Sequence, residues 1–411
     1  MSSDAASSRD PAGGAASDLL LARVVREESG RLVGALARRI GSLDVAEEAV
    51  AAAIESALVD WRRNGVPPRP GAWLMQAARH DALDRLRRER VYRAKLALLA
   101  SDPPAGESDA DERLPLLVGC CHPAIAAEAQ LALTLRAVCG LTTEQIARAT
   151  LSAVPTVAQR IVRAKRKIGS AGIPLAIPDG AERAPRLDVV LSIVSVMYSE
   201  AHLVAGADAA ADRDLADDAL WLAAVVADAL PSEAEAHGLV ALLLLHRARE
   251  SARSVDGDLV LLGEQDRSRW DAALLDRGRR ALERAALLRR PGRWQLHAAI
   301  AACHADAPAA DETDWLQILT LYDMLLAYDR SPVVRLNRAV ALAEVEGAEA
   351  GLVEVERLSS ALEGYHLWHA VRGHLLRRMG LEDAATAADL RALELTANRA
   401  EQRLLAARAG R

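Results

Sequence analysis

The chain has 411 residues, 51% of them hydrophobic and 26% charged, with a formal net charge of −6. This length and composition fit a soluble, folded protein of two to four domains. Aromatic residues make up only 3% and Phe is absent, which disfavours a β-sandwich or barrel and favours helices packed through Leu, Ala and Val. We therefore expect an all-α fold.

The sequence also excludes a membrane protein. Its four cysteines are too few and too scattered for a disulfide framework. Residues 1–17 lack the basic start of a secretory signal and are expected to form a disordered tail. The most apolar stretches, residues 219–230 and 239–245, are too short to span a bilayer. A cytoplasmic location follows from these features.

Apolar residues recur at helical spacing along most of the N-terminal part. This spacing predicts helices at residues 18–39, 45–62 and 72–98. An Asn-Gly pair and three prolines exclude helix from residues 63–71. Residues 102–112 contain five acidic and no basic residues, interspersed with Pro, Gly and Ser, which is the composition of a linker.

A helix-turn-helix pattern follows the linker. We expect a helix at residues 123–139, a short helix at 143–149, and a longer helix from Pro155 to about Ile168. In a helix-turn-helix the second helix enters the DNA major groove, where Gln and Arg read bases and Lys contacts phosphate. An αα-hairpin with a solvated basic face is the alternative. The residues predicted to bind DNA here are Thr156, Gln159, Arg160, Arg163, Arg166 and Lys167.

A second basic segment lies before the linker, where residues 79–95 carry seven basic and three acidic residues. An aromatic side chain beside an Arg-rich helix can hold an unstacked base while the arginines bind phosphate. A Trp at a helix start is also common in a protein core. Two separate basic patches indicate a polyanion with two contact sites. The candidate residues are Trp73, Arg79, His80, Asp84, Arg85, Arg87 and Arg88.

The C-terminal part, from residue 187, is predicted to be helical apart from an extended piece at 258–262. Residues 335–347 and 368–380 are amphipathic, end in Gly about 33 residues apart, and each precede a second helix. A period near 34 indicates a tetratricopeptide-like (TPR-like) repeat, with a plain helical bundle as the alternative. Residues 179–411 carry a net charge of −10.

Together the two basic modules resemble the bacterial sigma-70 superfamily, in particular its extracytoplasmic-function (ECF) sigma factors. Residues 43–50 (LDVAEEAV) look like region 2.2, and residues 70–88 look like regions 2.3 and 2.4. Residues 140–147 (GLTTEQIA) and 156–165 (TVAQRIVRAK) are similar to region 4. The sequence departs from the family at Ala51-Ala52 and at His80-Asp81.

The resemblance implies a protein that directs promoter-specific transcription initiation. It implies that Asp44, Glu47 and Glu48 bind core RNA polymerase at its β′ clamp, with the β flap as a further contact. The Trp73 set would read the −10 element and the Thr156 set the −35 element. Because polymerase performs the chemistry, we expect no catalytic residue, cofactor or metal, and no enzyme.

The remainder resembles the ECF subgroup with a long TPR-like extension, on residues 120–123, 266–271, 295–302 and 331–340. In that subgroup the extension is expected to regulate activity, through a regulatory protein or ligand. The expected domains are a tail (1–17), a region 2-like module (18–98), an acidic linker (99–119), a region 4-like module (120–175), a helical extension (176–290) and TPR-like repeats (291–411).

Three alternatives stay open from the sequence. The chain could be a helical-repeat scaffold that binds peptides and whose DNA-binding module does not engage polymerase. Cys120-Cys121-His122 could form a metal site, although buried small side chains fit adjacent cysteines better. Residues 266–271 (DRSRWD) are interpreted as an interdomain salt-bridge cluster, with a ligand pocket as the alternative.

Overall fold

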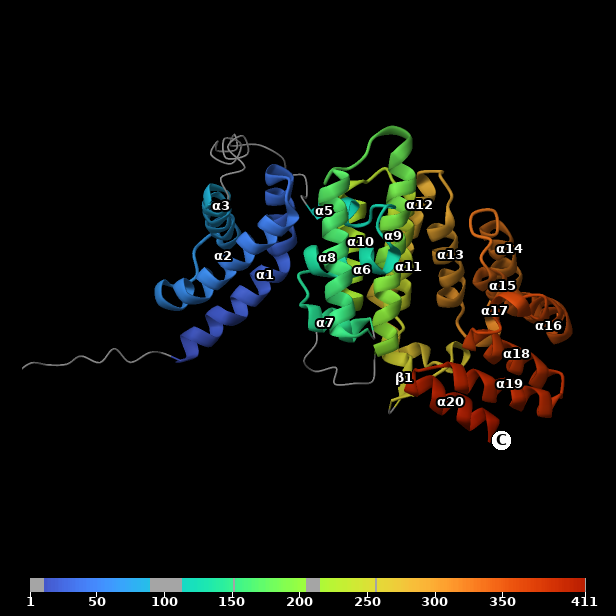
Figure 1. Ribbon diagram of the computed structural model, residues 1–411. Coiled ribbons are helices and arrows are strands. Elements are labelled where there is room, and N and C mark those ends of the chain that lie inside the picture. The colour runs from blue at the N-terminus through green and yellow to red at the C-terminus, as the bar shows by residue number, and fades with distance from the viewer. Residues whose placement is uncertain (1–10, 89–112, 151, 205–214, 256, 411) are drawn as a thin grey trace, which may run out of the picture. The chain divides into compact units, whose positions relative to one another are not determined.

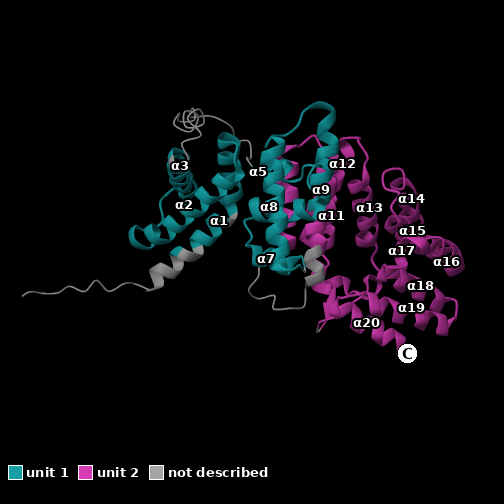
Figure 2. Cartoon of the chain, in the orientation of Figure 1, with its two compact units in different colours: residues 1–193 teal, residues 194–411 magenta. Residues whose placement is uncertain are grey.

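A computed structural model of the chain describes residues 11–88, 113–150, 152–204, 215–255 and 257–410 (Figure 1). The chain divides into two compact units, residues 1–193 and 194–411 (Figure 2). In the described part, the strands are β1 (Ser254–Val255) and β2 (Asp258–Leu259), which pair antiparallel. The expected all-α fold is confirmed, and β2 falls inside the extended piece predicted near residue 258.

Unit 1 opens with three helices, α1 (Pro11–Ile40), α2 (Leu43–Asn64) and α3 (Pro70–Arg88). Ser42 caps α2 by accepting from Val45 N at 3.4 Å. Gly65, at φ 82°, ends α2 in a conformation that favours glycine. The core between the three helices includes the fully buried Trp61 and Leu74.

The limits of these helices correct one prediction and leave another untested. The first helix starts at Pro11, not after Asp18, so residues 11–17 extend the helix instead of forming part of the tail. Proline is favoured in a first helical turn, and Ala12, Ala15 and Ala16 have high helix propensity, which offsets the low propensity of Gly13 and Gly14. The third helix was expected to reach residue 98, but residues 89–98 lie outside the described part.

The second half of unit 1 contains α5 (Arg113–Cys120), α6 (Ala127–Ala137), α7 (Thr143–Ala149) and α8 (Val154–Ala171). After η1 (Gly180–Glu182) the chain enters α9 (Arg183–Val204), within which the two units divide. Helix α5 lies partly in the expected linker, because the acidic run stops at Glu112 and the next residues, from Leu114 to Val118, are mostly buried and apolar.

Helix α6 is shorter than the predicted helix at residues 123–139. The segment before it turns at His122, whose carbonyl accepts from Ile125 N and from Gln130 Nε2, both at 2.9 Å. The two halves of unit 1 meet where α1 passes the end of α6. A Cβ on Gly30 would lie only 2.4 Å from Val138 O, so the backbones touch and glycine is required there.

Unit 2 continues with helices and short 3₁₀ turns around a core that contains Leu245, Trp270 and Ala302. Helix α11 packs closely on its neighbours, because a Cβ on Gly238 would lie 2.7 Å from Gln295 N. The elements are α10 (Leu215–Ala229), α11 (Ala234–Arg247), η2 (Glu250–Ala252), η3 (Leu262–Glu264), η4 (Arg267–Arg269), α12 (Ala272–Leu287), α13 (Arg293–Asp306) and η5 (Ala310–Glu312).

The rest of unit 2 consists of helix pairs. Both glycines that were predicted to end repeat helices, Gly347 and Gly380, have positive φ, 101° and 76°. Within the pairs, Gly351 lies against Ala343, and Gly373 lies against Asp389. The helices are α14 (Trp315–Leu325), α15 (Pro332–Glu346), α16 (Ala348–Glu356), α17 (Ser359–Leu362), α18 (His366–Arg378), α19 (Glu382–Leu395) and α20 (Arg399–Ala409).

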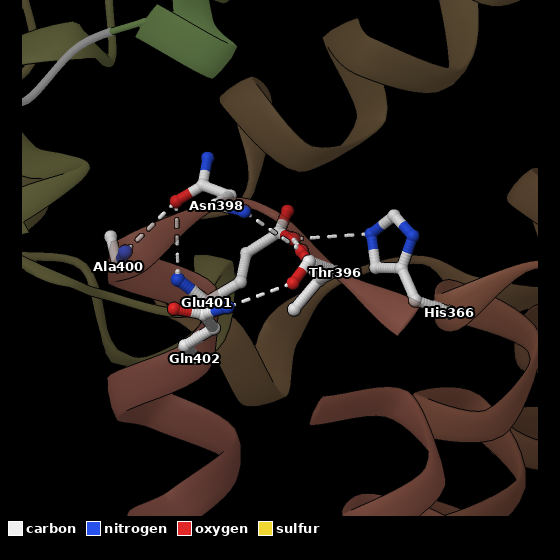
Figure 3. Close-up of polar contacts among 6 residues, drawn as sticks. All are labelled: His366, Thr396, Asn398, Ala400, Glu401 and Gln402. Carbon is white, nitrogen blue, oxygen red and sulfur yellow. Dashed lines mark hydrogen bonds and ion pairs between the residues drawn. The ribbon is translucent and has the colours of Figure 1, made fainter. Parts of the chain in front are cut away.

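A polar cluster fixes the start of the last helix (Figure 3). Asn398 caps α20 by accepting from Ala400 N at 2.9 Å and Glu401 N at 3.3 Å. The Glu401 carboxylate accepts from Thr396 Oγ1 at 2.5 Å and lies 3.1 Å from His366 Nε2 at the start of α18. The cluster therefore joins the first turns of two helices that are far apart in sequence.

Candidate nucleic-acid interface

The helix-turn-helix at α7 and α8 is built from strong local signals. Thr142 and Gln145 form a capping box at the start of α7, with the Gln145 N to Thr142 Oγ1 bond at 3.2 Å. Pro155 lies in the first turn of α8. Ile146 and Val157 are fully buried, so the two helices are held by an apolar contact. The predicted limits of α7 match the structure.

The six residues predicted to bind DNA lie on one side of α8. They are spaced three, four, seven, ten and eleven residues from Thr156, which places them on a single helical face. Five are exposed and Arg160 is partly exposed. Arg160 Nη1 donates to Ser152 Oγ at 3.2 Å, which holds its head beside the turn. The face therefore presents guanidinium, ammonium, amide and hydroxyl groups together.

The second predicted set lies on α3, and its residues do not all share one side of that helix. Trp73, His80, Asp84 and Arg87 follow one another at helical spacing along the side opposite the buried Ala78 and Ala82. Trp73 is partly buried because its ring packs edge-on against Trp61, with centroids 5.7 Å apart. The indole of Trp73 thus packs against the core through Trp61 and remains partly exposed at the surface.

The arginines of the α3 set differ in their surroundings. Arg87 Nη1 lies 3.2 Å from Asp84 Oδ1, in a pair exposed to solvent. Arg85 bridges Asp81 on its own helix and Glu48 on α2, and these hydrogen bonds raise its pKa above the ordinary value. Arg79 flanks the stripe, and the side chain of Arg88 lies outside the described part.

The carboxylates predicted to bind polymerase all have intramolecular partners. Asp44, Glu47 and Glu48 share one face of α2 at spacings of three and four residues. Lys165 Nζ lies 3.0 Å from Asp44 Oδ1 and also contacts Glu47 Oε2. Glu48 forms an ion pair with Arg85. We call the contact of Lys165 with Asp44 and Glu47 the Lys165 bridge.

Sequence reasoning assigned Lys165 to no site. A signal was nevertheless present, because Lys165 lies two residues from both Arg163 and Lys167, about 200° around the helix from each. It is therefore the one cation of the α8 basic run that points away from the predicted DNA-binding face. What the sequence lacked was the position of α2 beside it.

The thiols near the start of the region 4-like module form part of the core. Cys120, Cys121 and Cys139 are buried, and burial raises the pKa of Cys121 to about 12. A thiol with so high a pKa is a poor metal ligand and nucleophile at neutral pH. Among the described residues, no group of three or more His, Cys, Asp and Glu side chains is arranged to hold a metal ion.

The DRSRWD segment differs from the expected interdomain salt-bridge cluster. Asp266 Oδ1 accepts from Ser268 N at 3.0 Å, and Asp271 Oδ1 accepts from Ala273 N at 2.9 Å, so both carboxylates cap helices. Arg267 Nη1 donates to the carbonyl of His304 at 2.6 Å, and its guanidinium lies 4.5 Å from the Trp270 ring centroid. The segment orders turns within unit 2.

Two family models match the chain. One is described as "Sigma-70, region 4" and matches residues 116–168, from the middle of α5 through most of α8. The other is a family of unknown function, DUF6596, which matches residues 186–286. The matched residues include the helix-turn-helix of α7 and α8, so the sequence match and the fold agree over this segment.

A protein of Rhizobium meliloti (strain 1021), described as uncharacterized protein R00370, is 40% identical over 381 residues, which cover 90% of each chain. The chain belongs to the same family as this relative over nearly its whole length. No solved structure matches the chain. Among the described helices, none combines the length and apolarity needed to cross a bilayer.

Proposed function

We propose that this protein is an ECF-type sigma factor that binds core RNA polymerase and directs promoter-specific transcription initiation. The observation that carries the proposal is the α8 face, where six polar or basic side chains share one side of the second helix of a helix-turn-helix. That arrangement matches the way such helices read base edges and phosphates in the major groove. The sigma-70 region 4 match covers the same helix.

The proposal assigns a role to each part of the chain. Helix α8 reads the −35 duplex, and the α3 stripe around Trp73 captures the −10 strand. The α2 carboxylates bind the β′ clamp of polymerase, and the β flap contacts the region 4-like module. The TPR-like helix pairs of unit 2 regulate activity through a protein or small ligand.

Run-off transcription tests the proposal directly. Purified full-length protein is added to core RNA polymerase with a template carrying the DNA upstream of its own gene, and a specific transcript is expected. The Arg160→Ala/Arg163→Ala variant should lose that transcript while it still binds core polymerase. If polymerase plus protein yields no transcript above polymerase alone, and no association is seen by pull-down, the proposal is wrong.

One observation favours the scaffold alternative. Ala51 is exposed and continues the stripe of Glu47 and Glu48 on α2, so the stripe lacks a polar side chain at that position. A repeat protein that binds peptides through unit 2 would not need polymerase contacts on α2. The pull-down separates the two functions, because the scaffold would not retain core polymerase.

A further inference from the structure

The Lys165 bridge connects two surfaces to which the proposed function gives different tasks. Lys165 lies on the −35-reading helix α8, while Asp44 and Glu47 lie on the polymerase-binding face of α2. The side chains of Lys165 and Glu47 are only 16% and 13% exposed, whereas that of Asp44 is 65% exposed. The contact of Lys165 with Glu47 is thus largely shielded from water, while Asp44 stays at the surface, and shielded pairs are less screened by salt than surface pairs.

The charges of the bridge support one another. Burial by itself lowers the pKa of Lys165, but the charge and hydrogen bonds of Glu47 and Asp44 outweigh it and hold that pKa above the ordinary value. The ammonium is therefore charged at neutral pH. Lysine suits this place because one compact charge on a flexible stem can reach two carboxylates.

The surrounding packing shows that the bridge is part of a broader contact within unit 1. Arg113 Nη1, on α5, donates to Glu27 O on α1 at 3.2 Å. Gly30 on α1 approaches Val138 O, and a Cβ on Gly140 would meet Ser29 Oγ at 3.0 Å. The bridge adds a charged contact, between α2 and α8, to the same two halves of unit 1.

The bridge is also incompletely satisfied. Within the described residues, Glu47 Oε1 is buried and has no hydrogen-bond partner. An unsatisfied buried acceptor costs about 1–3 kcal/mol. A partner that supplied donors to both Glu47 oxygens would therefore compete well with Lys165.

We propose that Lys165 is an internal competitor of polymerase: in the free protein it covers Asp44 and Glu47, and polymerase binds α2 only after Lys165 leaves. This inference rests on the proposed function, since it needs Asp44 and Glu47 to contact polymerase. The DNA-binding face of α8 lies on the other side of the helix, so the bridge covers the polymerase surface and leaves the DNA surface open.

Two substitutions at Lys165 and one matched control test the competition. Lys165→Met removes the charge but keeps the apolar stem, and Lys165→Glu adds repulsion against Asp44 and Glu47. Both should bind core polymerase about fivefold more tightly or better, if the open form is a fifth or less of the free protein. Both should bind the −35 duplex as the wild type does. Lys167→Met, on the DNA-binding face, should weaken duplex binding and leave polymerase affinity unchanged.

A second measurement uses the unaltered protein. The sequence contains three lysines, Lys95, Lys165 and Lys167, so amine acetylation followed by mass spectrometry reads each one separately. Lys165 should react more slowly than the exposed Lys167 in the free protein and should gain reactivity when core polymerase is added. Equal reactivity of Lys165 and Lys167 in the free protein would overturn the inference even if the variants failed to fold.

The outcomes separate this inference from the proposed function. If polymerase binds but neither Lys165 variant binds it more tightly, the competition is wrong and the sigma-factor function stands. If polymerase does not bind at all, the proposed function fails and the competition fails with it, while slow acetylation of Lys165 would still report the bridge.

Discussion

Arg377 on α18 donates from Nη2 to Oδ2 of Asp389 on α19 at 2.7 Å, and the Asp389 side chain is completely buried. The space around this carboxylate is set by Gly373, where a Cβ would lie 2.7 Å from Asp389 Oδ1. Arg377 also lies 3.5 Å from Glu382. The helix pair is therefore packed around one charged contact as well as around apolar side chains.

Removing Arg377 should destabilise unit 2 strongly. Arg377→Ala leaves the Asp389 carboxylate buried without its cation, and such losses cost about 3 kcal/mol or more. Urea unfolding followed by circular dichroism measures the effect. Arg391→Ala is the matched control, because Arg391 pairs with Glu394 in solvent and should cost less than about 1 kcal/mol. Equal effects of the two variants would contradict this account.

The α8 face predicts a graded loss of DNA affinity. Arg163→Ala should weaken binding to a −35 duplex by about 1–3 kcal/mol if Arg163 reads a base, and should change the preference at one position. If Arg163 instead contacts phosphate, the loss should be uniform across sequences and the salt dependence should fall by about one charge. Fluorescence anisotropy at several salt concentrations distinguishes the two.

A control for that experiment lies on the same helix. Val162 is exposed but stands outside the DNA-binding face, so Val162→Ala should leave both affinity and salt dependence unchanged. A loss in this variant equal to that of Arg163→Ala would mean that the face has been placed incorrectly.

Trp73 should support single-strand binding through its ring. Base stacking on an aromatic side chain contributes about 1–3 kcal/mol per base, so Trp73→Leu should weaken binding of a single-stranded −10 oligonucleotide by the polymerase complex. Trp73→Phe should retain part of the affinity because a ring remains. If Leu and Phe at this position give the same affinity, Trp73 acts through its packing on Trp61 and not through stacking.

His304 makes the stability of unit 2 depend on pH. Burial, with further contributions from Arg249 and Arg267, lowers the pKa of His304 to about 4. In the unfolded chain the His pKa is near 6.5. Between about pH 4 and pH 6.5 the unfolded chain therefore binds a proton at this side chain and the folded chain does not. The contribution of His304 is therefore complete above pH 6.5 and is lost as the pH falls toward 4, by about 2 kcal/mol at pH 5.

Replacing this side chain should remove that part of the pH dependence. His304→Phe keeps an aromatic ring against Trp315, which His304 contacts edge-on at 5.2 Å between centroids. The difference in unfolding free energy between pH 7 and pH 5 should be smaller in the variant than in the wild type. An unchanged difference would show that His304 does not titrate as its burial implies.

Local signals in the sequence were sufficient for much of the architecture. The proline at 155 placed the start of α8, and the two repeat glycines placed the ends of α15 and α18. The helix at residues 143–149 was also predicted, and the structure shows the capping box at Thr142 and Gln145 that starts it. The six candidate residues of α8 were predicted from residue type and from their position off the apolar face, and the helix geometry places them on one side. These features depend on neighbours within about ten residues.

Other features could not be predicted, some because they depend on distant residues and some because composition masked a local signal. The Lys165 bridge joins positions more than a hundred residues apart, and the roles of Asp266 and Asp271 as caps depend on local backbone geometry that charge patterns do not reveal. Helix α5 was not predicted because the linker, assigned from the acidic composition of residues 102–112, was extended over the five apolar residues that begin at Leu114. The split of the α3 arginines likewise depends on how α2 packs beside them.

The two sides of α8 bear on how this family can diversify. The residues proposed to read DNA and Lys165, which contacts α2, alternate along a few turns of one helix, yet point in opposite directions. A lineage could therefore exchange Thr156, Gln159 or Arg163 and acquire new target genes without altering how the protein engages the transcription machinery. The set of target genes can change while the contact with α2 is kept, because at 3.6 residues per turn neighbouring positions of the helix face different directions.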